Sequence, residues 1–131
     1  NGIFLTTDII KGPIHLYGEE GQMKQVLINL LKNAIEAISD NGKIHISCSI
    51  EPQDIILIKI RDNGVGMDKQ VVEKIFDPFF STKINGTGLG MMISEKIIAE
   101  HGGTIAIESQ KGQGTTVTIQ LPYTSNIEAT D

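Results

Sequence analysis

The chain has 131 residues, of which 40% are hydrophobic and 21% charged, a balance typical of one soluble globular domain. Its net charge of −5, with basic residues scattered along the chain, argues against a nucleic-acid-binding module. The single cysteine, Cys48, excludes an internal disulfide, and no apolar run approaches the roughly 18 to 20 residues of a membrane-spanning helix. We therefore expect a cytoplasmic domain without direct membrane contact, with any anchor in a longer parent protein.

The first third of the chain predicts extended structure followed by a long helix. Residues 1–16 are expected to form one or two extended segments. Apolar residues then recur at three-and-four spacing from about Glu19 to Ser39, which is typical of a helix with one apolar face. That face consists of Met23, Val26, Leu27, Leu30, Leu31, Ala34 and Ile38. The run "SDNG" at 39–42 ends the helix and opens a turn.

The rest of the chain predicts strands and shorter helices. The strands are expected at 43–50, 55–62, 104–109 and 115–121, and the helices at 68–76 and 89–101, with a loop over 77–88. The inward residues of the helix at 89–101 are expected to be Leu89, Met92, Ile93 and Ile97. We predict a two-layer α/β sandwich over residues 1–122, with a mixed, mostly antiparallel sheet covered on one face by about three helices. Residues 123–131 are a polar tail.

Asn29 and Asn33 are four residues apart in the long helix and therefore share one face. Asparagine is a mediocre residue for a helix interior. Its amide oxygen is a hard, neutral ligand that suits Mg²⁺, an ion that takes further oxygens from phosphates. A solvated polar face is the alternative explanation for this pair.

Asp62 falls on the inward face of its strand, counting by twos from Ile56. A carboxylate that points toward an apolar interior is costly without a hydrogen-bond donor. The donor is either the backbone of the local "DNG" turn or an amine on a ligand. Gly66 favours the ligand, because it frees space for a flat molecule beside the carboxylate.

The segment "NGTGLG", residues 85–90, places three glycines directly before a predicted helix. Such loops let backbone N–H groups and the positive end of the helix dipole meet phosphate oxygens. The glycines do not follow the first strand of a βαβ unit, which excludes a dinucleotide fingerprint, and the Gly-Lys-Ser/Thr ending of a Walker loop is absent. Taken alone, the segment is also compatible with a flexible turn.

Five motifs follow one another in a specific order. They are "NLLKNA" (29–34), "DNGVGM" (62–67), "FDPFFSTK" (76–83), "GTGLG" (86–90) and "GQGTTVTIQLP" (112–122). Together they resemble the N, G1, F and G2 boxes of the catalytic, ATP-binding domain of sensor histidine kinases, which share an ATPase superfamily with gyrase B, Hsp90 and MutL. The resemblance covers about residues 10 to 122 and implies the Bergerat ATP-binding fold. The run "QVLINLLKNAIEA" is similar to nitrogen-regulator and sporulation-type kinases of bacteria.

The resemblance implies that ATP and Mg²⁺ are the cofactors and assigns roles to matching residues. Asn33 is expected to bind Mg²⁺ with Asn29 one turn away, and Asp62 to accept a hydrogen bond from the adenine amino group. Thr115 is expected to support Asp62 through its hydroxyl. The expected adenine pocket consists of Gly64, Gly66, Met67, Ile75 and Leu89. The expected lid and phosphate contacts are Phe76, Phe79, Phe80, Lys83, Gly86, Thr87, Gly88 and Gly90, with Asn29, Asn33 and Lys83 as the catalytic residues. Phe79 and Phe80 as ordinary core, and Lys83 as a solvated charge, are the alternatives.

Asn29 stands where the gyrase and Hsp90 branches have a glutamate that activates water. An amide cannot act as a general base, so ATP hydrolysis should be slow, which suits a kinase that transfers its γ-phosphoryl group to a protein histidine. Catalysis would then rest on positioning and on charge neutralisation by Mg²⁺, Lys83 and backbone donors.

The acceptor histidine is expected outside this chain. His15 and His45 lie in predicted strands and His101 at a helix end, and none has the surroundings of a phospho-accepting H box. The expected partners are therefore a dimerisation domain with its histidine, N-terminal to Asn1, and a downstream response regulator or phosphorelay protein. Two alternatives are an anti-sigma-factor-type serine kinase, against which "DPFF" and "STK" count, and a non-catalytic nucleotide-binding module.

Overall fold

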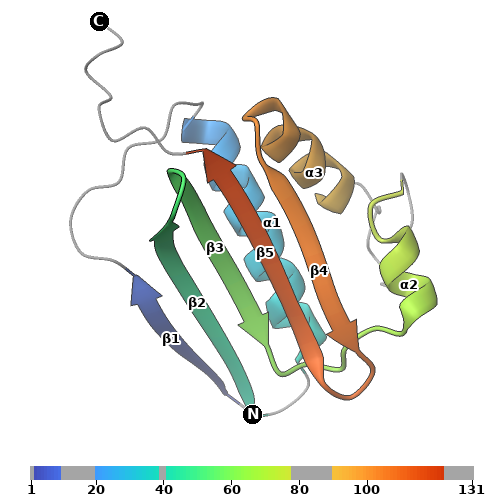
Figure 1. Ribbon diagram of the computed structural model, residues 1–131. Helices are drawn as coiled ribbons and strands as arrows, with labels where there is room; N and C mark the ends of the chain where they lie inside the picture. The colour runs from blue at the N-terminus through green and yellow to red at the C-terminus, as the bar shows by residue number, and fades with distance from the viewer. Residues whose placement is uncertain (1, 10–19, 39–40, 78–89, 123–131) are drawn as a thin grey trace, which may run out of the picture.

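A computed structural model describes residues 2–9, 20–38, 41–77 and 90–122 (Figure 1). Its five-stranded sheet has the order β1-β2-β3-β5-β4. The strands are β1 (Ile3–Ile9), β2 (Gly42–Glu51), β3 (Ile55–Asp62), β4 (Thr104–Gln110) and β5 (Gly114–Pro122), and the helices are α1 (Glu20–Ala37), α2 (Lys69–Lys74) and α3 (Gly90–Glu100). The predicted two-layer α/β fold is confirmed. The predicted bounds of the three helices and of β2 to β5 agree with the observed ones to within two residues, and β1 lies within the extended structure predicted over 1–16.

The connections explain the mixed sheet. β1 pairs with β2 in parallel, and all other neighbouring strands are antiparallel. A parallel pair needs a crossover connection, which α1 supplies by running behind the sheet in Figure 1. The two antiparallel hairpins, β2–β3 and β4–β5, need tight turns. Gln53 and Asp54 have positive φ angles of 70° and 59° between β2 and β3, and Gly112 has a φ of 82° in the predicted "KGQG" turn between β4 and β5.

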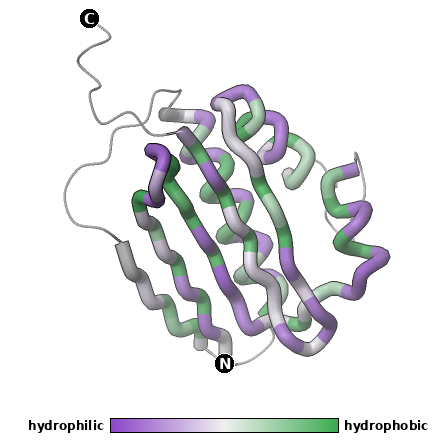
Figure 2. Tube along the Cα trace, in the orientation of Figure 1, coloured by the Kyte–Doolittle hydropathy of each residue, from purple (hydrophilic) through white to green (hydrophobic). Residues whose placement is uncertain are grey.

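The core lies between α1 and the centre of the sheet. Val26, Leu30 and Ala34 of the predicted apolar face are buried and pack with Ile60 and Ile119. The outer members of that face are partly buried at the border of the core: Met23, Leu27, Leu31 and Ile38. Figure 2 shows apolar and polar residues alternating along β2 and β3, as expected for a sheet with one covered face.

The buried face of α3 differs from the predicted one. Its buried residues are Met91, Ser94, Ile97 and Ile98. Of the predicted inward residues, Ile97 is buried and Ile93 is partly buried and packs against the core. Met92 is only partly buried and is not part of the core, so its prediction was wrong, and Leu89 lies outside the described residues. The reason is that α3 packs against α1 as well as against β4, which turns Met91 and Ser94 toward α1.

No helix within the described ranges is long and apolar enough to cross a lipid bilayer.

Candidate functional site

Asp62 is the last residue of β3 and lies on the covered face of the sheet, as its parity predicted. Its side chain is only 7% exposed. Oδ1 accepts a hydrogen bond of 2.8 Å from the backbone N–H of Gly64, which is the local donor considered from the sequence. Burial raises the pKa of the Asp62 carboxyl, while hydrogen bonding to the backbone of Gly64 and Thr115 lowers it in part. A carboxylate has about four lone-pair sites, so this one retains the capacity for an additional donor.

The loop after Asp62 is tightly enclosed by backbone on two sides. A Cβ atom on Gly64 would lie 2.5 Å from the carbonyl oxygen of Ala37, the last residue of α1. Gly66 has a φ of 72°, and a Cβ there would collide with the carbonyl oxygen of Gln110. The predicted reason for Gly66, open space for a flat ligand, was therefore wrong. The glycine is required by its left-handed backbone and by the close approach of the β4–β5 turn.

Asn29 and Asn33 lie at the interface of α1 and α3. Asn29 Nδ2 donates to the carbonyl oxygen of Gly90 (3.5 Å) and to the hydroxyl of the fully buried Ser94 (3.4 Å). Asn33 Nδ2 donates to the sulfur of Met91 at 3.0 Å. Both side chains are partly buried, so a solvated helix face does not explain them. Their amide nitrogens fix them to the start of α3, and the amide oxygen is the ligand atom that each can offer to a cation.

This donor set fits Mg²⁺ in the presence of a phosphate ligand. Among the described residues no group of three or more His, Cys, Asp or Glu side chains could hold a metal ion. Mg²⁺ is typically bound by few protein oxygens together with substrate phosphates and water. Asn29 and Asn33 would supply neutral oxygens, and the negative charge would come from the ligand.

The loop after the Asp62 carboxylate is bonded to the helix that carries the two amides. The N–H of Val65, in the loop after Asp62, donates to the carbonyl oxygen of Ala37 at 2.9 Å, so the loop is bonded to the C-terminal end of α1. Asn33 precedes Ala37 by one turn and Asn29 by two, which places the amides about 6 and 12 Å along the helix axis from that contact. An elongated ligand with a polar base at one end and phosphates at the other matches this spacing.

Several other predicted residues surround the loop. Ile75 ends α2 and, with Phe76, packs against the core. Met67 is partly buried and hydrogen-bonded through its backbone N–H to Ser109 (2.8 Å). The hydroxyl of Thr115 contacts that of Ser109 at 2.8 Å, so the contact of Thr115 with Asp62 is made by its backbone and not, as predicted, by its hydroxyl.

Part of the predicted site falls on the segment between α2 and α3. Phe79, Phe80, Lys83, Gly86, Thr87, Gly88 and Leu89 lie outside the described residues, and their roles stay predictions. Gly90 is described and begins α3 beside Asn29. Of the histidines, His45 is exposed on β2 and bonded to the Thr6 hydroxyl, and the His101 ring contacts the carbonyl oxygen of Ile97 at 2.8 Å, while His15 is not among the described residues.

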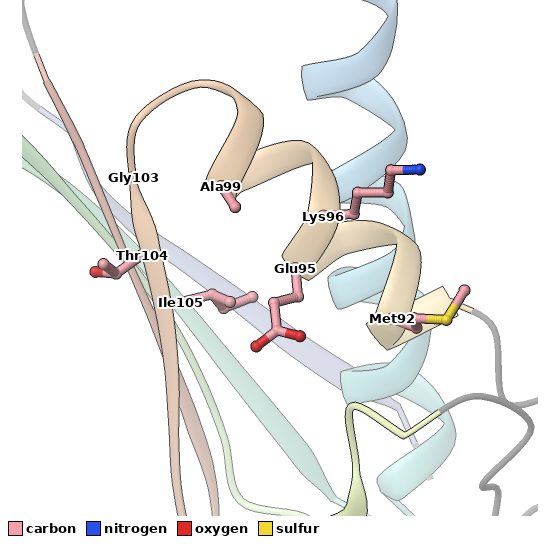
Figure 3. Close-up of a pocket in the computed structure, with 7 residues that line it drawn as sticks. All are labelled: Met92, Glu95, Lys96, Ala99, Gly103, Thr104 and Ile105. Atoms are coloured by element: carbon pink, nitrogen blue, oxygen red, sulfur yellow. The ribbon is translucent and has the colours of Figure 1, made fainter.

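Two cavities within the described part of the chain lie away from Asp62 and the asparagines. One, of about 460 Å³, lies between α3 and the start of β4, where Glu95 and Ile105 point toward one another (Figure 3). The other, of about 720 Å³, lies between the start of α2 and the β4–β5 turn and includes Met67 and Ser109. Neither is lined by Asp62, Asn29 or Asn33.

Three contributors to this arrangement were not predicted: Ala37, Ser94 and Ser109. Ser94 carries a recognisable signal, because it is a small polar residue at the helical spacing of Met91 and Ile97. Ser109 carries a similar one, since it continues the inward alternation of Ile105 and Ile107 on β4. Ala37 acts through its carbonyl group, and a backbone contact has no signature in the residue type.

A family of known proteins accounts for these features. The model of the family described as "Histidine kinase-, DNA gyrase B-, and HSP90-like ATPase" matches residues 18–125. The chain belongs to this family. The description of this family agrees with the predicted resemblance. The match covers most of the chain, as the resemblance did.

Curated relatives within this ATPase family are sensor kinases. Sporulation kinase E of Bacillus subtilis is 43% identical over 128 residues, which is 98% of this chain and 17% of that protein. The signal transduction histidine-protein kinase AtoS of Escherichia coli is 49% identical over 100 residues, or 76% of this chain and 16% of that protein. The chain thus spans about a sixth of the length of these relatives.

Similar solved structures confirm the fold. The nucleotide-free catalytic domain of histidine kinase ThkA has a TM-score of 0.81 at 37% identity, over 92% of this chain and 79% of that one. The mycobacterial sensor histidine kinase MprB has a TM-score of 0.83 at 22% identity, over 92% of this chain and 84% of that one, a likeness that concerns the fold alone.

Proposed function

We propose that the chain is the catalytic domain of a two-component sensor kinase, which binds ATP with Mg²⁺ and donates the γ-phosphoryl group to a histidine of the kinase's dimerisation domain. The observation that carries the proposal is the placement of a buried carboxylate, Asp62, and two interhelical amides, Asn29 and Asn33, along α1. It is supported by the family of the chain and by the names of its relatives, which are sporulation and signal-transduction kinases.

Asp62 would recognise the base. One carboxylate oxygen is bonded to Gly64, and the carboxylate has further acceptor sites for the adenine amino group. Because the Asp62 side chain is buried, a hydrogen bond from the ligand replaces no strong contact between the carboxylate and bulk water. A base without the amino group would bury the carboxylate without a donor for that bond. This asymmetry would give selectivity for adenine.

Asn33 and Asn29 would hold the metal end of the nucleotide. Mg²⁺, when bound, would neutralise charge on the phosphate oxygens during transfer. The hydrogen bonds to Met91, Gly90 and Ser94 fix the two amides before any ligand arrives, which lowers the entropic cost of binding. Lys83 and the backbone of Gly86, Thr87, Gly88 and Gly90 would contact the phosphates, with Phe80 and Leu89 closing the pocket.

Asn29 would also limit the reaction with water. A primary amide does not accept a proton at neutral pH, so Asn29 offers no general base to activate water. The γ-phosphoryl group would then be preserved for the protein acceptor. The partners would be the dimerisation domain and a response regulator or phosphorelay protein, and the reaction would take place in the cytoplasm.

Nucleotide binding is tested by calorimetric titration of a non-hydrolysable ATP analogue with Mg²⁺. We expect Asp62→Asn to fold but to lose at least tenfold in affinity, about 1.4 kcal/mol or more. Asp54→Asn is the matched control, since Asp54 is exposed in the β2–β3 turn and has a positive φ that asparagine tolerates. Wild-type affinity in folded Asp62→Asn would refute adenine recognition by this carboxylate.

Phosphotransfer is tested separately. The chain is incubated with radiolabelled ATP, alone and with a dimerisation domain that carries its histidine. We expect label on the supplied domain, little on the chain itself, and none after the acceptor histidine is replaced by glutamine. Tight nucleotide binding without transfer to any cognate domain would instead support a non-catalytic module.

A further inference from the structure

Ser109, near the end of β4, connects three segments through one hydroxyl group. Its Oγ accepts a hydrogen bond of 2.8 Å from the backbone N–H of Met67. It donates to the carbonyl oxygen of Gly114 at 3.0 Å and contacts the hydroxyl of Thr115 at 2.8 Å. The hydroxyl therefore joins the loop after Asp62 to the end of β4 and to the start of β5.

The hydrogen-bonding capacity of this hydroxyl is fully used. A serine hydroxyl has one proton and two acceptor lone pairs. The Gly114 carbonyl can only accept, so it takes the proton of Ser109, and Thr115 then donates its own proton to Ser109 Oγ. The N–H of Met67 uses the second lone pair. An apolar residue at this position would leave the partly buried Met67 N–H without its acceptor.

Ser109 also occupies a place where an apolar side chain is expected. Ile105, Ile107 and Ser109 alternate on the covered face of β4, and the two isoleucines pack against the core. At the third position the sequence has a hydroxyl that faces the loop and not the core. The hydrogen-bond partners of Ser109, and not the volume of its side chain, explain why a serine occupies this position.

The three contacts of Ser109 are made with two segments that touch Asp62, the loop after β3 and the start of β5. Met67 ends the loop whose Gly64 N–H bonds the Asp62 carboxylate, and the same loop is bonded to the β4–β5 turn through Gly112 N–H and Val65 O (2.7 Å). Thr115 is the register partner of Asp62 across β3 and β5, and its backbone hydrogen-bonds the carboxylate. A shift of the Ser109 hydroxyl would thus move the loop and the strand that together hold the carboxylate.

We propose that Ser109 is a positioning residue of the nucleotide site, which sets the selectivity for adenine by fixing the loop from Asp62 to Met67 without touching the base. This inference rests on the proposed function. It attributes the position of the Asp62 side chain to a residue on the edge strand β4, which is separated from β3 by β5.

The test compares Ser109→Ala and Ser109→Thr with wild type, using Mg²⁺ complexes of ATP and GTP analogues. We expect Ser109→Ala to weaken ATP binding about tenfold and to reduce the ATP-to-GTP affinity ratio, and Ser109→Thr, which keeps the hydroxyl, to restore most of both. A purely structural role would lower both affinities together and leave their ratio unchanged. Ser49→Ala is the control, because it removes a hydroxyl that bonds Glu51 on β2, distant in register from the site.

A spectroscopic readout keeps the inference falsifiable if Ser109→Ala fails to fold. The amide proton of Met67 should be protected from hydrogen exchange in the wild-type chain, and rapid exchange there would overturn the inference. Asp62→Asn separates the two proposals. Wild-type affinity in folded Asp62→Asn would refute adenine recognition by Asp62, on which both proposals depend. Loss of affinity in Asp62→Asn, with wild-type affinity and selectivity in folded Ser109→Ala, would refute only the role of Ser109.

Discussion

The backbone N–H of Val65 donates a 2.9 Å hydrogen bond to the carbonyl oxygen of Ala37. Helix C-termini leave their last carbonyl groups without intrahelical partners, and this bond satisfies one of them with the loop that follows Asp62. The helix that carries Asn29 and Asn33 is therefore bonded directly to the loop that follows the buried carboxylate. The two ends of the proposed site are fixed relative to each other before a ligand binds.

Gly64→Ala should destabilise this junction. The added Cβ would lie 2.5 Å from the Ala37 carbonyl oxygen and 2.8 Å from the Ala37 side chain, so the helix end and the loop must separate. We expect a loss of roughly 1–3 kcal/mol in the free energy of unfolding, measured by urea denaturation. Gly21→Ala is the control, because a Cβ at Gly21 meets nothing within 4 Å and alanine is the better helix former. Equal stability of Gly64→Ala and wild type would contradict the close contact.

The raised pKa of Asp62 predicts a pH-dependent stability difference. An aspartate in an unfolded chain titrates near pH 3.9, and burial raises the pKa of Asp62 above its ordinary value. The folded state binds this proton more tightly than the unfolded state, so the contribution of Asp62 to stability is greatest below the unfolded pKa and declines as the pH rises through the folded pKa. Asp62→Asn removes this dependence while keeping an acceptor for the Gly64 N–H.

The free energy of unfolding of Asp62→Asn, relative to wild type, should accordingly increase as the pH is raised from about 3 to 7. Urea denaturation at a series of pH values measures this difference directly. A difference that stays constant, or that decreases with pH, would show that burial is not the dominant influence on this carboxyl.

Asn33→Ala should remove the metal-dependent part of nucleotide affinity. In wild type, we expect the ATP analogue to bind more tightly with Mg²⁺ than with EDTA, because the Asn33 oxygen would be a ligand of the metal. In Asn33→Ala, the two affinities should become nearly equal. Gln25→Ala, which also removes an amide but from an exposed position on α1, should behave as wild type. An undiminished effect of Mg²⁺ in Asn33→Ala would exclude this residue as a ligand.

Asp68→Ala should weaken α2. The Asp68 side chain caps this six-residue helix by accepting a hydrogen bond of 3.0 Å from the N–H of Val71. Loss of such a cap costs about 1 kcal/mol, and Asp68→Ser should recover most of it. Hydrogen exchange of the α2 amides would report the change locally, and equal protection in Asp68→Ala and wild type would mean that the cap does not stabilise the helix.

The elements with a strong period were predictable from the sequence. The three-and-four spacing of Val26, Leu30 and Ala34 predicts both α1 and its buried face, because burial against a sheet requires that spacing. Asp62 lies an even number of positions after Ile56, which predicts its burial because alternate residues of a strand share one face. These are local patterns that tertiary contacts reinforce.

Features that depend on two elements at once were not predictable. The buried face of α3 was misassigned in part, with Met92 in place of Met91, because α3 packs on α1 and β4 together and its sequence is apolar enough to allow either residue. Gly66 was recognised as important for the wrong reason, because nothing local reveals that the Gln110 carbonyl approaches it. The hydrogen bond between Ser109 and Met67 likewise joins residues 42 positions apart in the chain.

The parallel edge of the sheet also bears on how the chain folds. Thr6 and His45, which face each other there, are 39 residues apart in sequence, whereas the β4–β5 hairpin closes from Gln110 to Gly114. Closing the long connection loses more chain entropy and must await the docking of the intervening helix. Assembly of the sheet is therefore expected to start from its hairpins and to add the first strand last, which makes that strand the earliest to detach on denaturation.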